Sequence, residues 1–207
     1  MTKRGKELVK EIWRKPFTYS MRKKLRIKNA RIISSMCVGG ILYHDLGLQF
    51  LSPTINMIIP KFVDFCEELE ETLLKPIEFL CYDSKNEYPI AKIDDYIIHG
   101  MHYKNFGELK EQWERRCRRF FSSTEEIVLM ATDAQVKMKD IDKFHQLPFR
   151  KVCFTSKSDI PYEEFVYIPD FEGETEVGDI LRYKNIWGTR MFEKYFDCVG
   201  WLNNEKK

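Results

Sequence analysis

The sequence predicts an α/β protein, a three-layer α/β/α sandwich built on a mainly parallel sheet. Two observations predict this class. Apolar runs of strand length alternate with amphipathic segments of helical length along most of the chain. With 43% hydrophobic and 32% charged residues over 207 positions, the composition is that of a globular protein that buries a sizeable core.

Eight apolar segments have the length expected of strands. The segments 90–93 and 96–99 flank the polar pair Asp94 and Asp95, which predicts a hairpin and makes the sheet mixed. The predicted strands cover residues 30–34, 55–59, 77–82, 90–93, 96–99, 126–131, 151–155 and 165–168.

Helices are predicted where apolar residues recur with spacings of three and four. The clearest spans residues 106–121, with Leu109, Trp113 and Cys117 on one side. Pro16 is expected to interrupt the first helix. The predicted helices cover residues 5–14, 41–48, 61–74, 106–121, 140–146 and 190–202.

Charge divides the chain into a basic N-terminal helical arm, residues 1–28, and a single α/β domain, residues 29–207. The arm holds eleven Lys and Arg against two Glu, although the whole chain is only +2, so the remainder is acidic. Aromatic residues between the cations suit peripheral contact with an anionic membrane. A basic helix that is simply solvated is the alternative. Nucleic acid is not expected, because no recognition motif accompanies the arm.

The cysteines indicate a reducing compartment. Six are widely spaced, with no Cys-x-x-Cys pair, and no signal peptide precedes them. No apolar run approaches the roughly 18 residues of a membrane-spanning helix. We therefore expect free thiols and a cytoplasmic protein.

Candidate chemistry gathers where predicted strands end, because ligands of open α/β sheets bind outside the carboxyl ends of the strands. In the first such turn, Gly39 and Gly40 allow close backbone approach to a phosphate, and Ser34 and Ser35 add hydroxyl groups. The spacing matches neither a phosphate loop nor a dinucleotide fingerprint. The four turns of interest are residues 34–40, 99–102, 132–133 and 155–156.

Cys37 lies in the first of these turns and is the candidate nucleophile. A helix N-terminus lowers the pKa of a thiol, and a nearby imidazole completes such a site; His44, His99 and His102 are available. The alternative is a small buried cysteine in a turn that the glycines merely shape. His99 and His102 lack a third ligand marked by spacing, so no metal site is predicted and the cofactor stays unknown.

The stretch IISSMCVGGILYHDLGLQFLSPT combines a strand, two small polar residues, Cys-x-Gly-Gly, an aromatic residue and a later Ser-Pro-Thr. It resembles the pattern of a bacterial family, domain of unknown function nineteen-nineteen, whose members are often labelled exopolysaccharide or capsule biosynthesis proteins. The segments FVDFCEELE, HGMHY, ELKEQWERRCRR and FDCVGWLN agree in the same order, so the resemblance covers about residues 29–203.

The resemblance implies a three-layer α/β fold and a role in making or decorating surface polysaccharide. The sequence departs from the family at Val38, where Trp is common, so no ring for sugar stacking is expected there. The family pattern carries over onto Ser34, Cys37, Gly39, Gly40, Tyr43, Ser52, Pro53, Thr54, His102, Tyr103, Trp113, Arg116 and Ser156.

Residues and resemblance together lead to a transferase hypothesis. The protein would bind a phosphorylated or nucleotide-activated sugar, with Cys37 as nucleophile and His102 as general base. The alternative is a non-catalytic sugar- or protein-binding component of a membrane-associated polysaccharide assembly. The substrate-binding residues of the transferase would be Ser34, Ser35, Gly39, Gly40, Ser52, Thr54, Tyr103 and Arg116.

Overall fold

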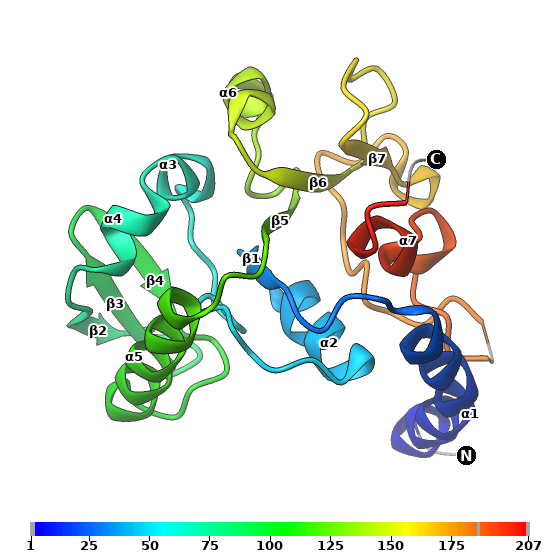
Figure 1. Ribbon diagram of the computed structural model, residues 1–207, viewed down its shortest axis with the longest axis horizontal. Helices are drawn as coiled ribbons and strands as arrows, with labels where there is room; N and C mark the ends of the chain where they lie inside the picture. The colour runs from blue at the N-terminus through cyan, green and yellow to red at the C-terminus, as the bar shows by residue number, and fades with distance from the viewer. Residues whose placement is uncertain (1–2, 186, 206–207) are drawn as a thin grey trace.

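The computed structural model describes residues 3–185 and 187–205, with side chains described from Ile12 onward. Its centre is a four-stranded sheet of order β1-β5-β6-β7 in which neighbouring strands run parallel (Figure 1). All four strands therefore end on the same edge, and the predicted α/β class is confirmed. The strands are β1 (Arg31–Ser34), β5 (Ile127–Thr132), β6 (Arg150–Thr155) and β7 (Phe165–Tyr167).

A separate antiparallel sheet holds β2 (Glu78–Tyr82), β3 (Pro89–Ile93) and β4 (Tyr96–His99). The predicted hairpin is thus confirmed, but the prediction of one mixed sheet is wrong. Asp94 has a left-handed backbone (φ 53°), which allows a two-residue turn between β3 and β4. Because such turns pair successive strands locally, these three strands bond to one another instead of joining the parallel sheet.

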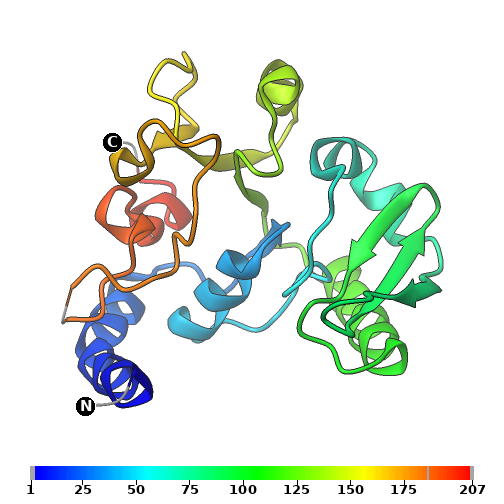
Figure 2. The same cartoon turned by 180° about the vertical axis from the view of Figure 1, so that it is seen from behind.

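Seven helices and three short 3₁₀ turns are described in residues 3–185 and 187–205. They are α1 (Lys3–Lys24), α2 (Cys37–Leu46), α3 (Phe62–Glu67), α4 (Leu69–Leu73), α5 (Phe106–Ser122), α6 (Ile141–Gln146), α7 (Cys198–Leu202), η1 (Met138–Asp140), η2 (Pro169–Phe171) and η3 (Phe192–Lys194). Seen from behind in Figure 2, α2 lies between the small sheet and α1.

Alternate residues of the parallel strands enter two separate apolar clusters. Ile33 and Leu129 pack with the small sheet and with α3, α4, α5 and α6. Ile32 and Val128, their immediate neighbours, pack with α2, η3 and α7. This alternation is the two-residue period of a strand whose faces are both covered.

Three predicted segments do not form the single continuous element that was expected. The segment 55–59 is not a strand, because Asn56 has a left-handed backbone (φ 58°) and the segment's one bridge within the described residues joins Ile58 to His99. The helix predicted over 61–74 divides at Glu68 into α3 and α4. The helix predicted over 190–202 divides too, because the Asp197 carboxylate caps a new helix by accepting from the N–H groups of Val199 and Gly200.

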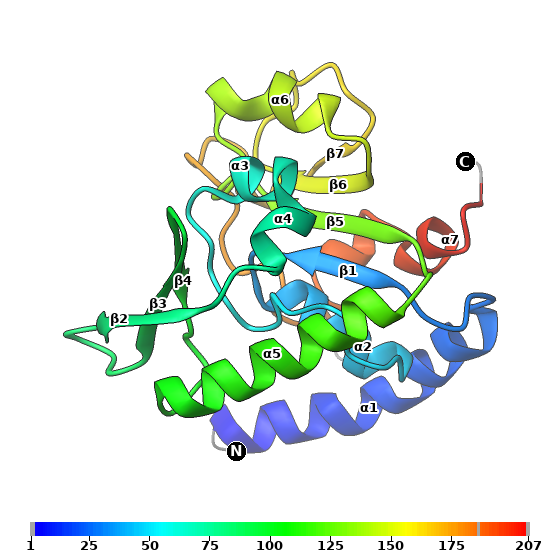
Figure 3. The same cartoon turned by 60° about the vertical axis from the view of Figure 1, so that its left-hand side comes forward.

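The N-terminal helix continues through Pro16 to Lys24, so the expected interruption is wrong. A proline inside a helix costs about 3 kcal/mol, and the buried residues Arg14 and Met21, one on each side of Pro16, offset this cost. Arg14 is only 4% exposed and forms ion pairs of 2.6 Å with Asp45 and Glu193. Figure 3 shows α1 running along the lower side of the molecule.

Burial by itself lowers the pKa of the Arg14 guanidinium, but the hydrogen bonds and charges of Glu193 and Asp45 more than offset it and raise the pKa. Arg14 therefore stays charged and fastens α1 to α2 and to the C-terminal segment.

Within the described residues, no helix is both long and apolar enough to cross a bilayer.

Candidate active site

The four turns identified from the sequence meet at the carboxyl edge of the parallel sheet. Cys37 Sγ lies 3.1 Å from His102 Nε2. Thr132 Oγ1 lies 3.3 Å from the Met36 sulfur, which brings the end of β5 against the turn after β1. Asp133 accepts hydrogen bonds from residues 155 and 156 at the end of β6. The pairing of thiol and imidazole on which the hypothesis depends is therefore present.

Cys37 is the first residue of α2, which begins four residues earlier than predicted. Met36 occupies the N-cap position and gives no side-chain cap, so the first N–H groups of the helix have no side-chain acceptor there. Cys37 is half-buried, and its sulfur faces the exposed ring of His102. This geometry places a thiol at a helix N-terminus with a base in reach.

Gly39 and Gly40 are buried in the first turn of α2 instead of forming an open loop. A Cβ at Gly39 would lie 2.8 Å from Ser34 Cβ, and one at Gly40 would lie 2.7 Å from Asn56 Oδ1. The glycines therefore allow α2 to pack closely against β1 and the following segment. Contact between these two residues and a substrate stays a prediction.

The hydroxyl groups predicted to bind substrate make hydrogen bonds within the protein. Ser35 Oγ accepts from Ile59 N–H at 2.8 Å, and Thr54 Oγ1 accepts from Ser34 N–H at 3.0 Å. The Ser52 and Thr54 hydroxyl oxygens lie 3.1 Å apart. Because all four side chains are at most 1% exposed, they bind the end of β1 to the segment that follows α2, and their role toward a substrate stays a prediction.

Tyr103 and Arg116 support the turn that carries His102. The Tyr103 hydroxyl donates to Ile55 O at 2.9 Å and accepts from an Arg116 N–H at 2.6 Å. The Arg116 guanidinium also lies over the Phe50 ring, 5.6 Å from its centroid. The described contacts of Arg116 are thus with this support and not with the thiol.

The two histidines of the His-x-x-His pattern point to different partners. His99 Nδ1 lies 3.3 Å from the Tyr88 hydroxyl, whereas His102 faces Cys37. Among the residues with described side chains, no three His, Cys, Asp or Glu gather as a metal site would require.

The pKa of the Cys37 thiol is raised, whereas a lowered pKa was expected. Burial raises its pKa, and the negative charge of Asp179 raises it further. The expected lowering of this pKa by the helix N-terminus is therefore wrong for the resting protein. Cys37 is protonated at neutral pH, so His102 would have to accept the proton as the sulfur reacts.

Asp133 holds the loop that brings Asp179 to the site. Its carboxylate accepts from Thr155 Oγ at 3.2 Å, from Ser156 N–H at 2.7 Å and from Val177 N–H at 2.8 Å. The turns at Thr132-Asp133 and Thr155-Ser156 were identifiable from the strand ends. Asp179 was not, because residues 172–179 lie outside every strand or helix and show no apolar periodicity.

The fold and this edge define an α/β protein with a thiol–imidazole pair at the carboxyl ends of its parallel strands. Sequence comparison matches residues 8–203 to the family described as domain of unknown function DUF1919, so the chain belongs to that family. The match starts at residue 8 and so includes most of the basic arm, beyond the region 29–203 of the resemblance.

A relative in Haemophilus influenzae, described as an uncharacterized protein, is 33% identical over 189 residues and covers 89% of each chain. The family and this bacterial relative carry no reaction with them, so function is argued from the site.

Proposed function

We propose that this protein is a transferase that acts on an activated or phosphorylated sugar through the Cys37–His102 pair, in the biosynthesis of exopolysaccharide or capsule. The observation that carries the proposal is the 3.1 Å contact between Cys37 Sγ and His102 Nε2 at the carboxyl edge. A nucleophile within hydrogen-bond reach of a base is the signature of covalent catalysis. We also propose that the helices around the sheet form the two outer layers of a three-layer sandwich. Helices in these layers cover the faces of the sheet and leave its carboxyl edge open to a ligand.

Each residue has a defined part in the transfer. His102 Nε2 takes the Cys37 proton as sulfur bonds to the electrophilic atom of the donor, and the bond from that atom to the departing oxygen breaks. The imidazolium then protonates this oxygen. In the second half, an acceptor hydroxyl gives its proton to His102, and its oxygen bonds to the transferred group as the bond from that group to the Cys37 sulfur breaks. The imidazolium of His102 then returns the proton to the thiolate.

A covalent adduct tests the proposal directly. Full-length protein is incubated with a panel of nucleotide-activated and phosphorylated sugars, and its mass is measured intact and after digestion. We expect an adduct on Cys37 that Cys37→Ser abolishes. His102→Ala should slow adduct formation on the order of a hundredfold, as for loss of a general base. Cys81→Ser, which removes an exposed thiol far from the pair in sequence, is the matched control and should change nothing.

Polysaccharide output in the native host supplies the second test. Cys37→Ser should reduce it, and Cys81→Ser should not. Unchanged output from cells that carry Cys37→Ser would remove the nucleophile from the proposal. Because the six cysteines are free thiols, the proposal also puts the protein in the reducing cytoplasm.

A non-catalytic component that binds sugar or protein is the second candidate. It is favoured by the raised pKa of the Cys37 thiol and by the internal hydrogen bonds of the buried hydroxyls. On this proposal, Cys37→Ser leaves polysaccharide output unchanged, while a bulkier Cys37→Trp, which fills the edge, reduces it.

A further inference from the structure

The outward side of α1 carries a line of exposed side chains. Ile12, Pro16, Tyr19 and Lys23 are spaced by four, three and four residues, which puts them on one side of a helix. Ile12 is 54% exposed and Tyr19 is 60% exposed. This outward ridge, residues 12, 16, 19 and 23, lies opposite the buried Arg14 on the exposed side of α1, where Tyr19 and Lys23 border the grooves beside the helix.

A pair of indole rings extends the ridge. The loop before residue 190 brings Trp187 onto Trp13, with ring centroids 5.2 Å apart and planes inclined at 70°. Both rings stay about half exposed. Large apolar side chains that gather on a surface mark a binding site, and Trp and Tyr are the residues most enriched at the interface between a bilayer and water.

Positive charge surrounds these apolar side chains. Between residues 12 and 30 the chain has seven Lys and Arg and no Asp or Glu. Arg14 is neutralised by its two buried carboxylates. Among the residues with described side chains, Arg22 donates to main-chain oxygens of His44 and Asp45 alone, so its charge is not cancelled by those bonds.

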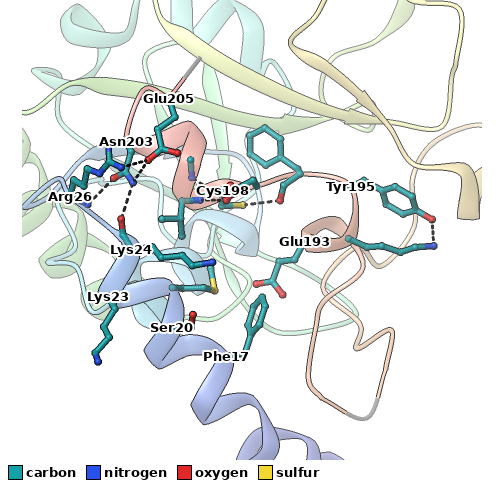
Figure 4. A pocket seen from close by; sticks show the side chains of 16 residues that line it. Phe17, Ser20, Lys23, Lys24, Arg26, Glu193, Tyr195, Cys198, Asn203 and Glu205 are labelled. Atoms are coloured by element: carbon teal, nitrogen blue, oxygen red, sulfur yellow. Dashed lines mark hydrogen bonds and ion pairs between the residues drawn. The ribbon is translucent and has the colours of Figure 1, made fainter. Parts of the chain in front are cut away.

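Two grooves flank α1, and they differ in charge. The groove of Figure 4, about 870 Å³, lies between α1 and the C-terminal segment and places Lys24 and Arg26 among acidic side chains; Arg26 pairs with Glu205 at 3.2 Å. The acidic residues lining it are Glu193, Asp197 and Glu205.

The second groove, about 790 Å³, is the more positive of the two. Four cations line it against the single carboxylate of Asp45, which Arg14 already binds. The buried Nε of Arg190 makes no hydrogen bond within the described residues, but it lies 3.6 Å from Asp45 Oδ2 and so forms an ion pair with that carboxylate. The four lining cations are Arg14, Lys15, Arg22 and Arg190.

We propose that this face of the protein binds the surface of an anionic lipid bilayer. Ile12, Trp13, Tyr19 and Trp187 enter the interface, and Lys15 beside the second groove contacts lipid phosphate. Apolar insertion and attraction between cations and anionic lipid are the two signals that together give stable peripheral binding. Neither uses Cys37, so the proposal is independent of the transferase chemistry.

Vesicle co-sedimentation of the full-length chain tests the charge. Vesicles of phosphatidylcholine alone are compared with vesicles that also contain phosphatidylglycerol. We expect binding to the second kind only, falling as salt is added. Reversing two charges with Lys15→Glu and Lys23→Glu should weaken it at least on the order of tenfold.

The matched control reverses two exposed lysines elsewhere, Lys61→Glu and Lys139→Glu, which changes the net charge by the same amount. It should retain most of the binding. Equal loss from both pairs would reduce the effect to net charge and overturn the proposal.

Tryptophan fluorescence tests the apolar contact in the unmodified protein. Brominated phosphatidylcholine, mixed with phosphatidylglycerol, should quench the emission, and Trp13→Phe with Trp187→Phe should remove most of that quenching. Trp113, which is 2% exposed, and the partly buried Trp201 provide the internal background. Absence of quenching, binding to neutral vesicles, or binding of inorganic phosphate by a protein that ignores vesicles would each overturn the proposal.

Discussion

Gly39 lies where α2 crosses the end of β1, and its missing side chain sets the distance between them. In Gly39→Ala the new Cβ would meet Ser34 Cβ at 2.8 Å, an atom held by the strand backbone. In Gly40→Ala the nearest atom, at 2.7 Å, ends the movable side chain of Asn56. We expect Gly39→Ala to lower the free energy of unfolding by about 1–3 kcal/mol. Gly40→Ala should cost less, and urea unfolding of both variants at one pH measures the difference.

The acidity of Cys37 gives a second prediction at this scale. Because burial and Asp179 raise the pKa of the thiol, the reactive thiolate is scarce at neutral pH and grows only as pH rises beyond the free-thiol value of about 8.5. Alkylation followed by peptide mass spectrometry should therefore be slower at Cys37 than at the exposed Cys81 at pH 7, and should still be rising above pH 9. A rapid reaction at pH 6 that is independent of pH would contradict this.

At the scale of elements, Asp133 connects three segments through one carboxylate. Asp133→Asn keeps the shape but replaces one acceptor oxygen with an amide that cannot accept from Ser156 or Val177. We expect a loss of about 1–3 kcal/mol in the free energy of unfolding. Amide hydrogen exchange should become faster in residues 174–179 first, since that loop depends on this contact. Uniform acceleration across β5 and β6 instead would show that Asp133 acts on the sheet and not on the loop.

The type of most elements could be predicted from the local sequence pattern, but the contacts between elements could not. The apolar stripe of residues 61–74 is buried as predicted, yet the helix divides at Glu68, whose carboxylate accepts from the distant Tyr96 hydroxyl. Pro16 is tolerated because Arg14 is held by residues 45 and 193. The residues that make these contacts lie far apart in sequence, so apolar periodicity cannot predict them.

The candidate site shows the same division. Cys37 and His102 could be predicted as residue types beside strand ends, because parallel strands share one edge. The raised pKa of the thiol could not, since it depends on burial and on Asp179, which arrives on a loop without periodicity. Asp197, by contrast, is a residue type typical of an N-cap, so the sequence could have predicted that a new helix begins within the segment 190–202.

At the scale of the whole molecule, buried thiols couple stability to alkaline pH. Burial raises the pKa of Cys66, Cys153 and Cys198 well above the usual range, and that of Cys117 to about 12. Below pH of about 8.5 both folded and unfolded chains keep these protons, so the thiols contribute no pH dependence. Above it only the unfolded chain ionises, and each thiol lowers the free energy of unfolding by up to about 1.4 kcal/mol per pH unit.

We therefore expect stability under reducing conditions to be level from pH 7 to 8 and to fall between about pH 8.5 and 10. Urea unfolding at each pH gives the slope. Cys117→Ala, whatever its own cost, should make that slope shallower by one thiol. A level profile to pH 10 would contradict the prediction.

The order β1-β5-β6-β7 also has a consequence for how the chain is made. Among the described strands, β1 sits at an edge and pairs with β5 alone, and the entire small sheet lies between these two strands in sequence. During synthesis, β1 (Arg31–Ser34) can form its hydrogen bonds only after β5 (Ile127–Thr132) has left the ribosome. The strands β2, β3 and β4 are close in sequence and can pair as soon as they emerge. The turn that carries Cys37 is therefore among the first parts translated and among the last to be completed.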